Sequence, residues 1–134
     1  MPTELKHKKF EAAGPSRSFL LEERITLQDG EQFKKYIHNS SPLLNLLEEE
    51  SEYHICLFLC ACQHFQYIKT HHMAYVSDFQ GYGGLLTDVQ IMTSPPSTPK
   101  ERLFGHGNIN EYFNKFPFEH QCNDFCLWLG LEHF

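Results

Sequence analysis

The pattern His120-x-Cys122-x-x-x-Cys126 constrains this chain more than any other short segment. If a helix starts near Cys122, the two thiols lie on one helix face, and the helix N-terminus favours their thiolate form. His120 can fold back beside them, which brings three zinc ligands within reach. A tetrahedral zinc site needs a fourth nitrogen or sulfur ligand. Spacing leaves that ligand open among His64, His71, His72, Cys60 and Cys62, and ordinary core thiols beside a surface histidine are the alternative interpretation.

The cysteines are best interpreted together with the expected location of the protein. There are five, an odd number, at positions 56, 60, 62, 122 and 126. No secretory signal is visible after Met1, and the longest apolar run, Ile55 to Cys62, is far shorter than the roughly 20 residues that cross a bilayer. We therefore expect a cytoplasmic protein without a membrane span, whose cysteines are metal ligands or core thiols rather than disulfides.

Length and composition favour one globular domain. The 134 residues suffice for a single core, and 41% hydrophobic with 14% aromatic residues exclude wholesale disorder. The 11 Lys and Arg against 17 Asp and Glu give a net charge of −6, which disfavours nucleic acid and anionic lipid as partners.

In the N-terminal half, turn signals separate short apolar segments. Residues 1–18 are expected to be poorly ordered, 19–21 to form a short strand, and Asp29-Gly30 to turn the chain before a short element at 33–37. A helix is predicted to begin at Pro42, because residues that favour the N-cap position precede it and four leucines at helical spacing follow it. The run 55–62 is apolar all round, as in a buried helix, although periodicity alone leaves its type open.

In the C-terminal half, alternation over 73–80 predicts a strand that enters a glycine-rich loop. The proline-rich stretch 94–100 predicts an exposed loop. Two short helices are expected to follow, one over 108–116 stopped by Pro117 and one over 123–129 closed by Gly130.

Two further segments could carry chemistry. Residues two apart in a strand face the same way, so Asp78 and Gln80 offer neighbouring oxygens that suit Mg²⁺, with Asp88 as a second carboxylate; exposed groups at a strand end are the alternative. The glycine pair in Gly105-His106-Gly107-Asn108 could bring backbone N–H groups to a phosphate or peptide, or it is a plain turn before a helix.

Taken in order, these segments resemble the alpha-kinase family, the atypical serine/threonine kinases that include elongation factor 2 kinase, myosin heavy chain kinases and channel-kinases. The resemblance covers about Phe19 to Leu131. It rests on landmarks that follow one another in register: Leu21-Glu22-Glu23, Phe33-Lys34-Lys35-Tyr36 with Asn39, Gln63-His64-Phe65-Gln66-Tyr67, Asp78-Phe79-Gln80-Gly81, Leu86-Thr87-Asp88, Gly105-x-Gly107-Asn108 and His120-x-Cys122-Asn123-x-x-Cys126 with Leu129-Gly130-Leu131.

The resemblance implies an α+β fold, the hinge and C-terminal lobe of an alpha-type protein kinase, over 19–131, between a ragged start at 1–18 and a tail at 132–134. It implies transfer of the ATP γ-phosphoryl group to Ser or Thr of a protein substrate. It also implies these site residues: a structural zinc held by His64, His120, Cys122 and Cys126; the magnesium of ATP held by Asp78 and Gln80; Asp88 as candidate base, with the choice between Asp78 and Asp88 open; and Glu22 or Glu23 beside the adenine.

The chain departs from the family pattern in ways that bear on activity. Most of the N-terminal lobe, with its phosphate-covering loop and lysine, has no counterpart, so we expect phosphotransfer by this chain alone to be weak or absent. Asn110, Val89 and Met92 stand where the family has Gly, Pro and His. A sheet without that lobe exposes an edge and an apolar face, which favours association. The alternative function is a zinc-stabilised, non-catalytic module that binds a partner through that face.

Overall fold

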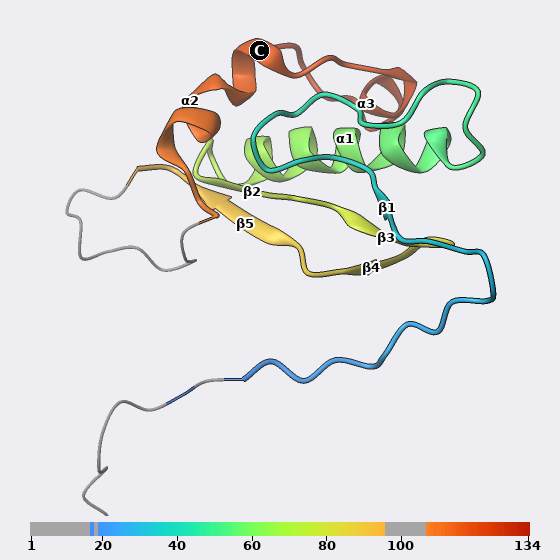
Figure 1. The fold of residues 1–134 in the computed structure, drawn as a ribbon. Helices are drawn as coiled ribbons and strands as arrows, with labels where there is room; N and C mark the ends of the chain where they lie inside the picture. Colours follow the sequence, from blue (N-terminus) through green and yellow to red (C-terminus); the bar gives the residue numbers. More distant parts are fainter. Residues whose placement is uncertain (1–16, 18, 96–106) are drawn as a thin grey trace, which may run out of the picture.

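The computed structural model describes residues 17, 19–95 and 107–134. Its elements, in chain order, are β1 (Lys34–Lys35), α1 (Tyr53–Lys69), β2 (Ala74–Ser77), β3 (Gln80–Tyr82), β4 (Leu85–Thr87), β5 (Gln90–Thr93), α2 (Asn110–Glu119) and α3 (Asp124–Trp128). The three helices lie together on one side of the strands (Figure 1). None of the helices described here is long and apolar enough to cross a membrane.

Helix α1 is the central element of the molecule. Its buried residues lie mainly on one broad face, which carries Cys56, Cys60, His64 and Tyr67. The apolar run in its first half therefore belongs to a helix that is buried in large part but not all round, since Phe58 is 45% exposed. The helix predicted from Pro42 is wrong, because the chain is irregular over 42–47 and α1 begins only at Tyr53. Backbone pairing replaces helical hydrogen bonds there: Ile37 bridges to Leu44, and the Asn45 N–H donates to the Tyr36 carbonyl at 2.9 Å.

Two small antiparallel sheets lie beneath the helices. One has the order β1-β3-β4 and the other pairs β2 with β5. The single strand predicted over 73–80 is divided, because Asp78 adopts a left-handed backbone with φ 57° between β2 and β3. Gly83 and Gly84, with φ 58° and 82°, form the two-residue turn between Tyr82 and Leu85, a conformation that glycine adopts without strain.

The segment before β1 is extended rather than paired. The short strand predicted at 19–21 is wrong: Phe19, Leu20 and Leu21 are 87%, 85% and 96% exposed and belong to no strand. A three-residue apolar run has nothing to pair with here, so its side chains stay in solvent. The turn at Asp29-Gly30 is confirmed, with Gly30 at φ 83°.

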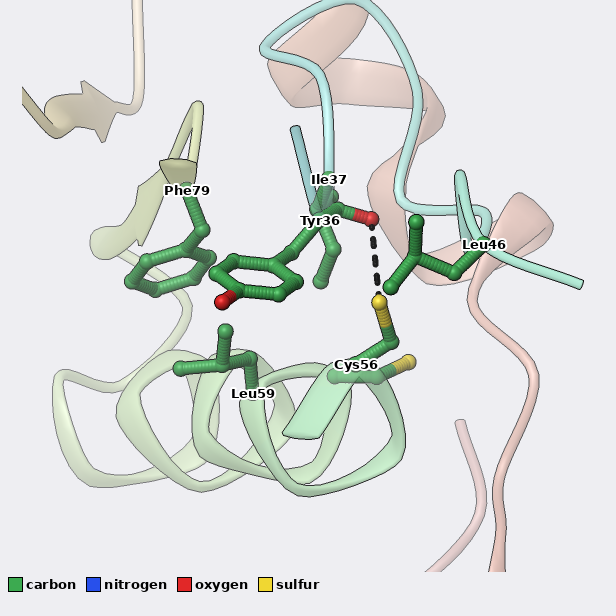
Figure 2. Close-up of a cluster of buried hydrophobic side chains, with 7 residues drawn as sticks. Tyr36, Ile37, Leu46, Cys56, Leu59 and Phe79 are labelled. Carbon is green, nitrogen blue, oxygen red and sulfur yellow. Dashed lines mark hydrogen bonds between the residues drawn. The ribbon is translucent and has the colours of Figure 1, made fainter. Parts of the chain in front are cut away.

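The core consists of two clusters, one at each half of α1. The first joins α1 to the β1 region and to Phe79, and Figure 2 shows Tyr36, Leu59 and Phe79 packed together while the Cys56 thiol donates to the Tyr36 carbonyl. The second joins the C-terminal half of α1 to β2, β5 and α2 through Tyr67, Tyr75, Met92, Phe113 and Phe116. Both clusters fix α1 relative to the strands.

Helix α2 differs from the prediction at both ends. It begins at Asn110 and continues through Pro117 to Glu119. Pro117 removes one N–H in the last turn, but Phe113 and Phe116 are buried against the core and keep the helix in place. Of the other predictions, those for residues 1–16 and 18, for the loop beyond Pro95, and for Gly105 and His106 lie outside the described residues.

Helix α3 follows its sequence signals closely. The Asn123 side chain caps it by accepting a hydrogen bond from the Phe125 N–H at 2.9 Å. At the other end Gly130, with φ 66°, lets the Leu131 N–H donate back to the Cys126 carbonyl. The predicted helix and its predicted glycine stop are both confirmed.

Candidate metal centre and acidic hairpin edge

Four side chains converge into one potential metal site. Their ligand atoms lie within 4.8 Å of one another, and the residues are His64, His120, Cys122 and Cys126. The Cys122 sulfur is 3.6 Å from His64 Nδ1, and the Cys126 sulfur is 3.8 Å from His120 Nε2. A tetrahedron with zinc–ligand bonds of about 2.0–2.3 Å has edges of about 3.3–3.8 Å. The donor set and its spacing therefore fit a zinc ion.

Three helices position these ligands. His64 lies on α1 and is fully buried, while His120 directly follows the last residue of α2. Cys122 precedes α3 and Cys126 lies within it, because the Asn123 cap starts the helix between them. Residues 58 positions apart in the chain thus meet at one point, which spacing alone did not reveal.

Each imidazole turns one nitrogen toward the cluster and the other toward a fixed partner. His64 Nε2 donates to the Glu132 carbonyl at 2.8 Å, which leaves Nδ1 facing the Cys122 sulfur. His120 Nδ1 lies 3.6 Å from the Cys60 sulfur, which leaves Nε2 facing the Cys126 sulfur. Such outer contacts orient histidine ligands in metal sites.

Burial sets the protonation of these groups. It lowers the pKa of His64, and it lowers the pKa of His120 to about 4, with a further decrease from the neighbouring His64 and His133. Both imidazoles are therefore neutral at neutral pH, the form that binds a metal. Burial and the neighbouring Cys126 raise the pKa of the Cys122 thiol, so metal binding there would release a proton.

The other residues that competed for the fourth position lie outside this cluster. Cys60 is buried beside it, and its sulfur contacts His120 Nδ1 and the Gln121 carbonyl. Cys62 belongs to α1 but not to the group, and His71 and His72 lie in the turn that follows that helix. Among the described residues, His64 is thus the histidine of α1 whose ring nitrogen faces the two thiols.

A second group of polar side chains, the acidic hairpin edge, lies at the open end of the β3–β4 hairpin and consists of Lys35, Asp78, Gln80 and Asp88. Asp78 lies two residues before β3 and Asp88 directly follows β4, and both have left-handed backbones, with φ 57° and 53°. Gln80 pairs in register with Thr87, and its amide nitrogen lies 3.5 Å from an Asp88 oxygen. The strand-alternation argument for Asp78 and Gln80 does not apply, since Asp78 is not in a strand, and the contact of Gln80 is with Asp88 instead.

Lys35 is a member of this group that sequence reasoning did not assign. Its ammonium forms an ion pair with Asp78, and both side chains are about one-quarter exposed. The register of β1 against β3 places Lys35 opposite Gln80, which explains the contact. The sequence assigns Lys35 no role, because pairing between β1 and β3 is a non-local feature with no signal in the local sequence.

The two glutamates proposed for the hinge line a groove. Glu22 and Glu23 border a space of about 750 Å³ together with Phe33 and Thr87. Glu22 is tied to β4, since its carboxylate accepts a hydrogen bond from the Thr87 hydroxyl at 3.1 Å. Thr87 is also the register partner of Gln80, so the groove adjoins the acidic hairpin edge.

Two asparagines hold the end of the glycine segment that the structure describes. The Asn39 amide donates to the Gly107 carbonyl at 3.1 Å. The Asn108 side chain bonds the Thr93 N–H at 3.0 Å and the Thr93 hydroxyl at 2.6 Å. Gly107 is therefore held by Asn39 and Asn108 by β5, which agrees with a structural turn before α2.

Comparison with known proteins places this chain in a family. The alpha-kinase family model matches residues 3–126. Alpha-protein kinase 2 of Danio rerio is 37% identical over 100 residues, 74% of this chain and 5% of that protein. Myosin heavy chain kinase B of Dictyostelium discoideum is 32% identical over 102 residues, 75% of this chain and 12% of that protein.

A solved structure shows the same likeness in three dimensions. The alpha-kinase domain of myosin heavy chain kinase A, in complex with AMPPCP, superimposes with a TM-score of 0.57 at 34% identity. The match covers 79% of this chain and 36% of that domain, so the chain spans about a third of a solved alpha-kinase domain and a small part of the full-length relatives. Its mixed helices and sheets are those of this fold, and the chain belongs to the alpha-kinase family.

Proposed function

We propose that this chain is the hinge and C-terminal lobe, over residues 19–131, of an alpha-type protein serine/threonine kinase. The proposed reaction transfers the γ-phosphoryl group of ATP to a Ser or Thr hydroxyl of a protein. Family membership supports the reaction class, and the AMPPCP complex of the related domain supports a nucleotide of the ATP type. The observation that carries the proposal is the acidic hairpin edge, where Gln80 contacts Asp88 and Asp78 pairs with Lys35, beside the groove bordered by Glu22.

The oxygen donors at this edge fit a magnesium ion, which would neutralise charge on the ATP phosphates. Carboxylate and amide oxygens are the ligands that Mg²⁺ takes in kinase sites. Gln80 and Asp88 are the pair we assign to it, because their side chains lie together; the Gln80 amide nitrogen now faces Asp88, and binding would turn the amide oxygen to the ion instead. Lys35 already compensates the charge of Asp78, and a cation there would compete with its ammonium. We therefore assign Asp78, oriented by Lys35, as the group that accepts the proton of the substrate hydroxyl.

The groove supplies the place for the adenine. Glu22 is held by Thr87 at its edge, and Glu23 is the adjacent lining residue. Because Thr87 immediately precedes Asp88, an adenine beside Glu22 would direct its phosphates toward the acidic hairpin edge. Glu22 is the glutamate with a described contact, so it is the one we assign to the hinge.

The metal centre has a structural role in this proposal. Two thiolates and two neutral imidazoles neutralise a Zn²⁺ ion and leave it no open position, which is typical of structural rather than catalytic zinc. The ligands would be His64, His120, Cys122 and Cys126. They join all three helices, and α1 in turn packs on β2.

The test is transfer of labelled phosphate from Mg·ATP to a generic basic protein, with zinc content measured on the same sample. Since the chain spans 36% of the related domain, we expect weak transfer or none from the chain alone. Any transfer present should fall by about 10²–10⁴-fold in Asp78→Ala, the range for loss of a general base. Transfer unchanged in Asp78→Ala would contradict the assigned role.

Nucleotide binding is tested separately by thermal unfolding with and without Mg·ATP. We expect stabilisation in the wild type and in Asp78→Ala, and its loss in Asp88→Ala, because Asp88 is assigned to the metal and Asp78 is not. Loss of stabilisation in Asp78→Ala but not in Asp88→Ala would instead assign the metal to Asp78 and proton acceptance to Asp88. No stabilisation of a zinc-loaded, folded chain would instead favour the zinc-stabilised, non-catalytic module.

A further inference from the structure

The last residues of the chain lie on the metal centre. The Phe134 ring is 4.4 Å from the His64 ring and 5.6 Å from the His120 ring, measured between centroids. It also packs at 5.2 Å from Tyr67 and 5.8 Å from Phe116, which belong to the second core cluster. One aromatic side chain thus contacts both imidazoles and the core beneath them.

A backbone contact from the same segment acts on the same ligand. The Glu132 carbonyl accepts a hydrogen bond from His64 Nε2 at 2.8 Å. This bond fixes which nitrogen of His64 is protonated and turns Nδ1 toward the Cys122 sulfur. The segment 131–134 therefore makes both a polar and an aromatic contact with His64.

The turn at the end of α3 explains how the chain arrives there. Gly130 has φ 66°, and the N–H groups of Gly130 and Leu131 donate to the carbonyls of Leu127 and Cys126. This geometry reverses the chain directly after the helix that carries Cys126. Residues 131–134 return across the ligands as a result.

We propose that the segment Leu131–Phe134 closes the metal centre, and this inference rests on the metal site of the proposed function. The Glu132 carbonyl holds His64 in the ligating orientation, and the Phe134 ring shields both imidazoles from water. Phe134 is 44% exposed, which fits a cover with one face on the ligands and the other in solvent. The segment slows release of the bound ion and makes no bond to it.

The experiment follows zinc release from the metal-loaded full chain into excess chromophoric chelator at neutral pH. Phe134→Ala is expected to release zinc about tenfold faster than the wild type, the lower end of what outer contacts contribute to metal affinity. Phe134→Trp, which keeps a ring over the imidazoles, is expected to stay close to the wild-type rate. Imidazole NMR is expected to show the Nε2 proton of His64 exchanging faster with water in Phe134→Ala.

Phe113→Leu is the control for a general loss of stability. Phe113 is 4% exposed and packs in the same aromatic cluster, at 6.0 Å from Tyr67 and 5.5 Å from Tyr75, away from the two imidazoles. It is expected to lower the melting temperature without accelerating zinc release to the same extent. Phe118→Ala, which removes a ring that is 88% exposed, is expected to change neither quantity.

The outcomes separate this inference from the proposed metal site. One zinc per chain with equal release rates for the wild type and Phe134→Ala would overturn the inference and leave the metal site standing. Equal acceleration by Phe113→Leu would also overturn it, because release would then follow global unfolding. A folded wild-type chain that binds no zinc would overturn the metal site and the inference together.

Discussion

Asp78 and Asp88 show how single backbone conformations position the acidic hairpin edge. Left-handed backbones cost free energy for most residues, and aspartate is among those that tolerate them best. Here two such residues bracket one hairpin, and each places a carboxylate at its open end. The ion pair with Lys35 fixes the first carboxylate, and the contact with Gln80 orients the second.

Gly81 is the residue on which that hairpin depends most directly. A Cβ atom at position 81 would collide with the backbone carbonyl of Leu85, and backbone cannot move aside as a side chain can. We expect Gly81→Ala to lower the free energy of unfolding by about 1–3 kcal/mol, the usual cost of overpacking. Urea unfolding of the zinc-loaded chain measures this.

The matched control for Gly81 is Gly84→Asn in the turn of the same hairpin. Gly84 has φ 82° with open space around it, and asparagine tolerates such a backbone. The control should therefore cost less than Gly81→Ala. A value for Gly81→Ala within about 0.5 kcal/mol of the wild type, the range of neutral surface changes, would show that the hairpin adjusts freely.

For single residues, the sequence predicts which side chains could bind a metal better than it predicts how they are arranged in space. The oxygen donors at 78, 80 and 88 follow from residue type, and the structure brings two of them into contact. Their arrangement depends on the left-handed Asp78, which strand alternation cannot anticipate. Lys35 was missed for a similar reason, since its position follows from strand register across 45 residues of sequence.

At the scale of elements, α3 is held by its neighbours rather than by its own length. It has five residues, Asp124–Trp128, too few for a helix that is stable alone. Asn123 compensates in two ways: its oxygen caps α3, and its amide nitrogen donates to the Leu57 carbonyl of α1 at 2.9 Å. The ligands Cys122 and Cys126 lie on either side of this anchor.

Asn123→Ala is accordingly expected to weaken both the helix and its attachment to α1. Loss of a cap costs about 0.5–2 kcal/mol and loss of a hydrogen bond about 0.5–1.5 kcal/mol. Asn123→Asp keeps the cap and loses only the donor, so its cost should lie between those of Ala and the wild type. Urea midpoints of the three chains provide the measurement, and equal midpoints for Ala and Asp would assign the whole effect to the bond with Leu57.

Local signals predict elements well only where tertiary contacts agree with them. The Asn123 cap and Gly130 stop give α3 correctly, and the apolar run from Ile55 gives the buried part of α1. The leucines after Pro42 carry an equally good helix signal, yet their backbone pairs with the β1 region instead. At Pro117 the burial of Phe116 outweighs a local stop signal.

For the whole molecule, the metal centre brings residues from the three described helices to one point. His64 lies on α1, His120 at the end of α2, and the two cysteines at α3. The ligand types follow from the sequence, whereas the choice of His64 over the other histidines and cysteines depends on how α1 packs against α3. A bound ion would cross-link these three helices beside the two core clusters that the described part of the chain forms.

Removal of the metal should therefore affect the whole fold. Structural zinc commonly contributes enough free energy that small domains unfold without it. We expect chelation to lower the melting temperature by more than about 10 °C, since roughly 2–8 °C corresponds to each kcal/mol in chains of this size. The measurement is thermal unfolding followed by circular dichroism, with zinc content determined before and after chelation.

Cys122→Ser and Cys60→Ala form the decisive pair for this prediction. Both remove one thiol near the cluster, but only the Cys122 sulfur is among the converging ligand atoms. The Cys122 variant should lose its zinc and melt at the temperature of the chelated wild type. The Cys60 variant should retain one zinc, and chelation should still lower its melting temperature. Retention of stoichiometric zinc by Cys122→Ser, or a melting temperature that chelation leaves unchanged, would mean that packing alone holds the helices together.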